Sequence, residues 1–88
     1  MTLKKGFTLR KIPGMSLVIP VGENINNYKG ALMLNDTAAL IFELIQSGLD
    51  REAIAERMTQ QYDISIEKAS ADIDKTFALL IEGGVAEA

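Results

Sequence analysis

The residues best able to carry chemistry in this sequence are its carboxylates and serines, because it contains no cysteine and no histidine. Asp72 and Asp74 form the densest acidic pair, but residues two apart on a helix point in different directions and do not converge on one ion. No histidine is available to activate any of the serines, which are Ser16, Ser47, Ser65 and Ser70. The sequence therefore predicts no catalytic site, no metal site and no bound cofactor.

The distribution of charge narrows the class of partner. The 88 residues are expected to form one domain, residues 1–88. Residues 1–34 hold five basic residues and one acidic residue, a balance of +4, whereas residues 35–88 hold four basic and eleven acidic residues, a balance of −7. The acidic part argues against nucleic acid as a partner. No apolar run reaches the ~20 residues of a membrane span and no signal peptide is evident, so we expect a cytoplasmic protein.

Three strands are predicted in the N-terminal part. Residues 7–12, "FTLRKI", alternate Phe7 and Leu9 with polar residues, and Pro13-Gly14 then favours a turn into residues 15–19, "MSLVI". These two runs are expected to pair as an antiparallel hairpin. Residues 21–29 are a loop by composition, and residues 30–34, "GALML", are predicted to form a third, short strand.

Three helices are predicted to follow, because side chains that cap helices precede each apolar stripe. Asn35 or Asp36 would cap the first helix, which runs to about Gln46, and Asp50 would cap the second, residues 51–62. Ser65 would cap the third, residues 66–82. The fold class is therefore α+β: a three-stranded antiparallel sheet followed by a three-helix, winged-helix-like bundle.

Two functions are compatible with this architecture. A winged-helix-like regulator would act through protein contacts or, weakly, through DNA read by its third helix. That helix carries two lysines against four carboxylates, so phosphate would repel it. A protein-interaction or peptide-binding module is the alternative, because an exposed strand edge accepts another strand through backbone hydrogen bonds. The same edge could pair with a second copy, so a monomer and a homodimer both remain open.

The segment "LNDTAALIFELIQSGLDREAIAERMTQQYDIS", residues 34–65, resembles the core of the PqqD-like proteins. The resemblance rests on a strand ending in Leu34-Asn35, an acidic residue and Thr37, an Ala-rich helix with Phe42 near its middle, and Gly48. Tyr62-Asp63 then closes the second helix, and Gly84-Val85 follows the third. The order and spacing of these elements extend over most of residues 7–86.

The resemblance implies a non-catalytic peptide chaperone, or recognition element, for ribosomally made modified peptides. Such a protein binds the leader segment of a precursor peptide against the third strand and presents it to a modifying enzyme, often a radical S-adenosylmethionine protein. A long, polar connection at residues 20–30 and the pair Thr76-Phe77 depart from the family pattern, so the product is either pyrroloquinoline quinone or that of another peptide pathway.

The predicted binding residues follow from this mode of binding. Backbone pairing is assigned to Gly30, Ala31, Leu32 and Met33, and the groove lining to Thr76, Phe77, Leu79 and Leu80. Asp36 and Thr37 are assigned to the start of the first helix, outside the groove. A proline at Leu32 is expected to remove a backbone donor and to weaken binding.

Overall fold

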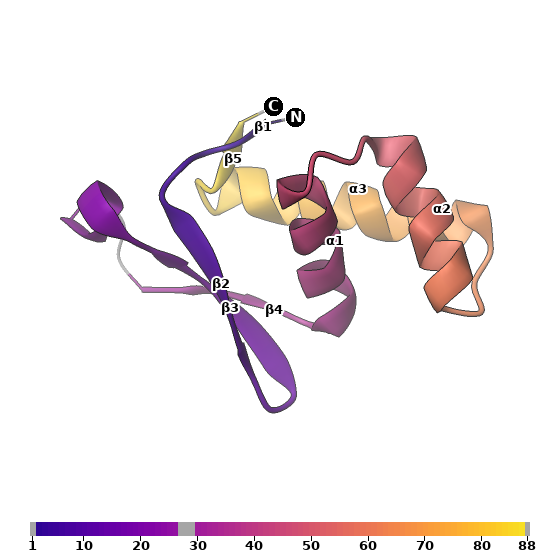
Figure 1. The fold of residues 1–88 in the computed structure, drawn as a ribbon, viewed down its shortest axis with the longest axis horizontal. Helices are drawn as coiled ribbons and strands as arrows, with labels where there is room; N and C mark the ends of the chain where they lie inside the picture. Colours follow the sequence, from indigo (N-terminus) through magenta and orange to yellow (C-terminus); the bar gives the residue numbers. More distant parts are fainter. Residues whose placement is uncertain (1, 27–29, 88) are drawn as a thin grey trace.

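The computed structural model describes residues 2–26 and 30–87, and the fold class predicted from the sequence is confirmed. A three-stranded antiparallel sheet, in the order β2–β3–β4, precedes three helices (Figure 1). Its strands are β2 (Phe7–Ile12), β3 (Met15–Pro20) and β4 (Leu32–Leu34). The helices are α1 (Asp36–Gln46), α2 (Arg51–Gln61) and α3 (Ile66–Glu82).

The predicted hairpin and helix caps are confirmed. Residues 12 and 15 pair across Pro13-Gly14, and Gly14 has a φ of 83°, which explains the glycine at this turn. The side chain of Asn35, rather than that of Asp36, caps α1. Asp50 and Ser65 cap α2 and α3.

Two structured segments were not predicted. A second, two-stranded sheet pairs β1 (Thr2–Leu3) with β5 (Ala86–Glu87), so the two ends of the chain lie side by side (Figure 1). A 3₁₀-helix, η1 (Gly22–Asn26), occupies the first part of the expected loop, and residues 27–29 of that loop lie outside the described residues. The third strand is shorter than predicted: it begins at Leu32, so Gly30 and Ala31 lie before it.

The core consists of two apolar clusters that share α1 and α3. One lies between the sheet and the helices, and its members include Val18, Leu34, Phe42 and Leu80. The other joins the three helices. The inner face of β3 carries Ser16 and Val18, so the more apolar set, Met15, Leu17 and Ile19, lies on the face turned away from the core. Within the described part of the chain, no helix is long and apolar enough to cross a membrane.

Candidate functional site

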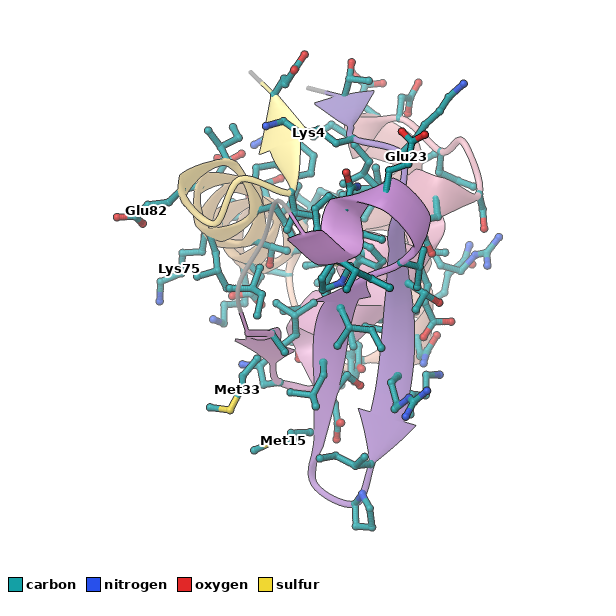
Figure 2. All side chains as sticks on the ribbon, turned by 90° about the vertical axis from the view of Figure 1, so that its left-hand side faces the viewer. Lys4, Met15, Glu23, Met33, Lys75 and Glu82 are labelled. Carbon is teal, nitrogen blue, oxygen red and sulfur yellow. The ribbon has the colours of Figure 1, made fainter. Side chains whose placement is uncertain are left out.

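Strand β4 offers the sheet a free edge. It pairs with β3 on one side and is the last strand in the sheet order, so among the described residues no strand lies on its other side. Met33, at its centre, has a side chain that is 61% exposed and points outward from the sheet, on the same side of the molecule as Lys75 of α3 (Figure 2). Backbone groups at this edge are therefore the first candidates for binding another chain.

A hydrogen bond at the far end of the hairpin fixes which β4 residue points its backbone to that edge. The N–H of Val21 donates to the carbonyl of Gly6 over 2.9 Å, one step beyond the Phe7–Pro20 pair. In an antiparallel ladder, hydrogen-bonded and non-bonded pairs alternate. Residues 15, 17 and 19 therefore direct their backbone groups to β2, whereas residues 16 and 18 direct theirs to β4.

The register of β4 against β3 then shows which β4 residues direct their backbone groups to the free edge. Leu34 pairs with Ser16 and Leu32 with Val18, so the backbone N–H and C=O groups of both leucines form hydrogen bonds with β3. Met33 lies between them, and its N–H and C=O point to the free edge. The expectation for Leu32 is thereby corrected: a proline there would remove a bond within the sheet, and Met33 provides the outward donor.

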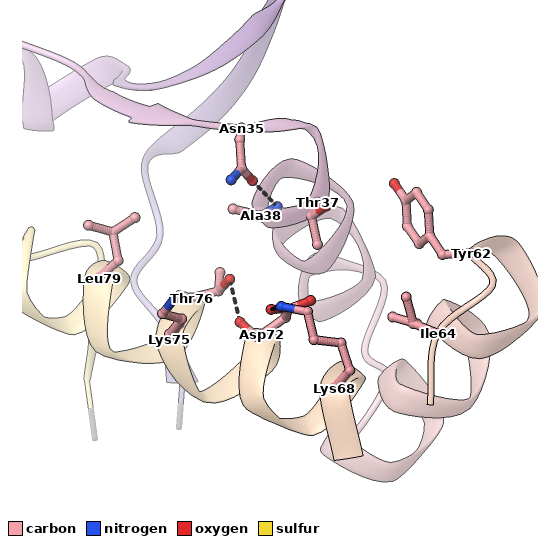
Figure 3. A pocket seen from close by; sticks show the side chains of 10 residues that line it. All are labelled: Asn35, Thr37, Ala38, Tyr62, Ile64, Lys68, Asp72, Lys75, Thr76 and Leu79. Atoms are coloured by element: carbon pink, nitrogen blue, oxygen red, sulfur yellow. Dashed lines mark hydrogen bonds and ion pairs between the residues drawn. The ribbon is translucent and has the colours of Figure 1, made fainter. Parts of the chain in front are cut away.

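A groove of about 540 Å³ lies between α3, the start of α1 and the connection from α2, and it meets the end of β4 at Asn35, the residue that follows the strand (Figure 3). We call it the β4–α3 groove. One wall is a stripe of α3 side chains spaced three or four residues apart, which places them on one helix face: Lys68, Asp72, Lys75, Thr76 and Leu79. Leu79, which the sequence analysis assigned to the groove lining, is 38% exposed and is one of the lining residues.

The opposite wall comes from the start of α1 and from the connection between α2 and α3. It consists of Asn35, Thr37, Ala38, Tyr62 and Ile64. The Asn35 side chain accepts a hydrogen bond of 2.8 Å from the Ala38 N–H, which fixes the passage from strand to helix at the groove. Thr37 was expected outside the groove and in fact lines it, because the first turn of α1 faces α3 across the hollow.

The charged side chains that line the groove differ in whether they form an ion pair within it. The Lys68 ammonium lies 2.8 Å from Asp72 Oδ1, so these two charges neutralise each other one turn apart on α3. Asp74 faces elsewhere and forms a two-point pair with Arg51 of α2, which raises the pKa of that arginine. Among the described residues no ion pair of Lys75 is found within 4.0 Å. Lys75 is therefore the groove's uncommitted cation.

Thr76 has a structural part in the wall. Its side chain is only 4% exposed, and its hydroxyl donates a 2.9 Å hydrogen bond to the Asp72 carbonyl one turn earlier. The hydroxyl is thus satisfied within the helix, and the threonine presents its remaining surface at the floor of the groove.

The other predicted lining residues divide between the groove and the core. Leu80 is fully buried in the cluster beneath the sheet, which corrects its placement in the groove. Phe77 packs against the cluster among the three helices and is not among the lining residues, because it lies ~100° around the helix from Thr76. Gly30 and Ala31 border a smaller hollow of about 130 Å³ at the start of β4.

Leu32 joins β4 to the end of α3. A Cβ atom added at Gly83 would lie 3.3 Å from Leu32 Cδ2, so the glycine lets the leucine approach the helix end closely. Strand and helix therefore meet at Leu32 and Gly83 and diverge toward Asn35, where the groove opens.

Sequence reasoning missed Lys75 as a candidate. Its signal was present, because Lys75 precedes Leu79 by four residues and so shares its helix face. Leu79 was assigned to the groove lining, whereas the lysine one turn before it was counted only in the charge balance of the third helix.

Comparisons with known proteins identify a family and a similar fold. A family model described as "Coenzyme PQQ synthesis protein D (PqqD)" matches residues 23–86. No curated protein matches the chain. A solved structure of TbiB1 in complex with the TbiA(beta) leader peptide is similar with a TM-score of 0.80 at 14% sequence identity, over 100% of this chain and 96% of that chain. At this identity the likeness establishes a shared fold.

Proposed function

This chain belongs to the PqqD family, and on that premise we propose that it is a non-catalytic recognition element for a ribosomally made precursor peptide. Residues 1–88 would act as one peptide-binding unit. The leader segment of the precursor would add to the sheet as a strand beside β4, with its side chains in the β4–α3 groove. TbiB1, which has the same fold, was solved with a leader peptide, and this supports the proposal.

One observation carries the proposal: the outward backbone groups of Met33 stand beside a groove already walled by α3 and α1. Backbone bonds to an edge give affinity with little regard to sequence, and side-chain contacts beside the edge add selectivity. The groove volume of about 540 Å³ is suited to a few side chains. The site thus has both elements that strand addition needs.

The chemistry would be performed by a partner. We propose that the bound leader is presented to a modifying enzyme, for which a radical S-adenosylmethionine protein with its own iron–sulfur clusters is the first candidate. The pathway would make pyrroloquinoline quinone or another peptide-derived product. Family membership and the leader-bound neighbour support a carrier role, in which this chain holds the peptide while its partner reacts with it.

The test is a titration of ¹⁵N-labelled protein with the leader of a precursor peptide encoded beside its gene, followed by amide chemical shifts. We expect shifts at residues 31–35 and 72–79, which border the free edge and the groove. Residues 8–11 of β2, at the other edge of the sheet, are the internal control and should not move. Shifts that spare the groove, or no shifts with any neighbouring precursor, would contradict the proposal.

A further inference from the structure

The spacing of two α3 side chains matches the repeat of an extended peptide. Lys75 and Leu79 lie one turn apart on the groove wall, so they are separated by about 6 Å along the helix axis. Residues i and i+2 of a strand point to the same face and are ~6.6 Å apart. Two successive groove-facing side chains of a bound strand can therefore meet Lys75 and Leu79 one to one.

The direction of the peptide follows from the sheet. All pairings in the β2–β3–β4 sheet are antiparallel, and antiparallel pairs are slightly more stable than parallel ones. We therefore take an added strand to run antiparallel to β4. Strand β4 starts at Leu32, beside the end of α3, and leads to Asn35, which lines the groove with Lys75. A strand antiparallel to β4 thus passes Lys75 first and Leu79 second.

The free edge fixes the register as well. A peptide residue bonded to the backbone of Met33 has its own side chain on the outer face of the sheet, as Met33 does. The residues before and after it point to the groove. They lie opposite Leu34 and Leu32, which brings the first to Lys75 and the second to Leu79.

We propose that this site selects leaders with an acidic residue two positions before a large aliphatic residue, the residue between them pairing with Met33. The inference rests on the proposed function and names the substrate class of the same groove. Lys75 is the cation free to pair with the acid, because Lys68 is already bound to Asp72. Leu79 supplies apolar surface for the aliphatic side chain.

Charge beyond Leu79 discriminates against the reversed order. Glu82 is exposed and lies three residues after Leu79, near the same helix face, on the side of α3 from which Lys75 also projects (Figure 2). In a peptide with the aliphatic residue first, the acid would stand by Leu79 and face Glu82. Repulsion there, and an aliphatic side chain on Lys75, would both weaken binding.

The experiment is selection from a displayed library of random, unstructured peptides, with groove binding of the selected peptides mapped by amide shifts. Wild-type protein should enrich the acidic–x–aliphatic order over its reverse by about tenfold. With Lys75→Glu, the enrichment of the acidic peptides should fall about tenfold, and basic–x–aliphatic peptides should be enriched in their place. Arg57→Glu, which makes the same change of charge on α2 outside the groove, should select as wild type does.

The outcomes separate this inference from the proposed function. Peptides that bind in the groove without the acidic–x–aliphatic pattern, or that Lys75→Glu selects unchanged, would overturn the inference and leave peptide binding intact. Selected peptides that shift no groove residue, or a library that yields no binder, would overturn the proposed function and the inference with it.

Discussion

The two edges of the sheet differ in their length and in the side chains that lie beside them. Strand β2 has six residues and the longer edge, whereas β4 has three. On β2, however, Arg10 and Lys11 place charge along the strand, which is how natural proteins discourage added strands. Lys11 is also bound to Glu43 of α1 over 2.7 Å. At the β4 edge the exposed side chain is that of Met33, and the nearby groove wall on α3 carries Lys75 and Leu79.

From this difference we expect the neighbouring side chains, rather than the count of free backbone groups, to decide which edge binds a peptide. If β4 is the docking edge, changes there should weaken peptide binding and matched changes on β2 should not. If the peptide simply seeks backbone groups, the longer β2 should matter at least as much.

The largest effect is expected from Met33→Pro. Proline removes the one donor that β4 directs outward, and it is tolerated at such a position because no bond to β3 is lost. Leader affinity should fall about tenfold or more, measured by isothermal titration calorimetry. The matched control is Lys11→Pro, which removes an outward donor from β2 by the same alternation and should leave affinity unchanged. Equal losses of affinity in both variants would contradict the prediction that the leader binds at β4 and not at β2.

Leu79→Ser should have the next largest effect, about a fivefold loss of affinity, because it removes apolar contact from the groove wall. Ile81 provides a control on the same helix, since both side chains are 38% exposed but Ile81 does not line the groove. Ile81→Ser should bind the leader as wild type does. Fluorescence anisotropy of a labelled leader would compare the two, and a loss confined to Ile81→Ser would place the peptide elsewhere.

Gly83→Val should lower affinity about threefold by a different route. The added side chain would press on Leu32 and on the Leu79 carbonyl, 3.2 Å from the Cβ position, and so displace β4 from α3. The free energy of unfolding should fall by about 1–2 kcal/mol in urea denaturation. Ala78→Val, at an exposed α3 position, reports the cost of a β-branched residue alone. If the two valines lowered affinity and stability equally, the close approach of Leu32 to Gly83 would not explain the effect.

The smallest effect is expected at β2. Lys11→Met should leave leader affinity unchanged, because the Lys11–Glu43 pair lies outside the groove. The hydrogen bond and charge of Glu43 raise the pKa of Lys11 above 10.5, so the pair's small stabilisation is present below that pH and disappears as pH rises through the higher value. The melting temperatures of variant and wild type should therefore converge above pH 10.5. Weakened leader binding by Lys11→Met would implicate the wrong edge.

The fold was largely accessible from the sequence because its signals are local. Asn35, Asp50 and Ser65 each accept a bond from a backbone N–H three residues on, and such caps are recognisable within one turn. The hairpin likewise depends on Pro13-Gly14 between two alternating runs. The β1–β5 pairing could not be predicted in this way, because a two-residue strand has no measurable period.

The site was harder to predict from the sequence, because it depends on the angular position of residues around α3 and on which backbone pairs of the sheet are hydrogen-bonded. The predicted lining residues 76–80 are near neighbours in sequence, yet successive helix residues turn by ~100°. Leu80 therefore lies in the core and Phe77 packs against the cluster among the helices, while Thr76 and Leu79 line the groove. Whether Leu32 or Met33 faces the free edge depends on the phase of the ladder, which the bond from Val21 to Gly6 reveals, and on the register of β4 against β3. No feature of "GALML" encodes either one.

The pairing of β1 with β5 has a kinetic consequence. Among the strand pairs of the described residues, Thr2–Leu3 and Ala86–Glu87 are the farthest apart in sequence, so we expect this pairing to form last. Opening must release both strands at once. The amides of the two segments should therefore exchange with deuterium at a common rate, faster than those of α1. Removing either strand would leave the other to fray.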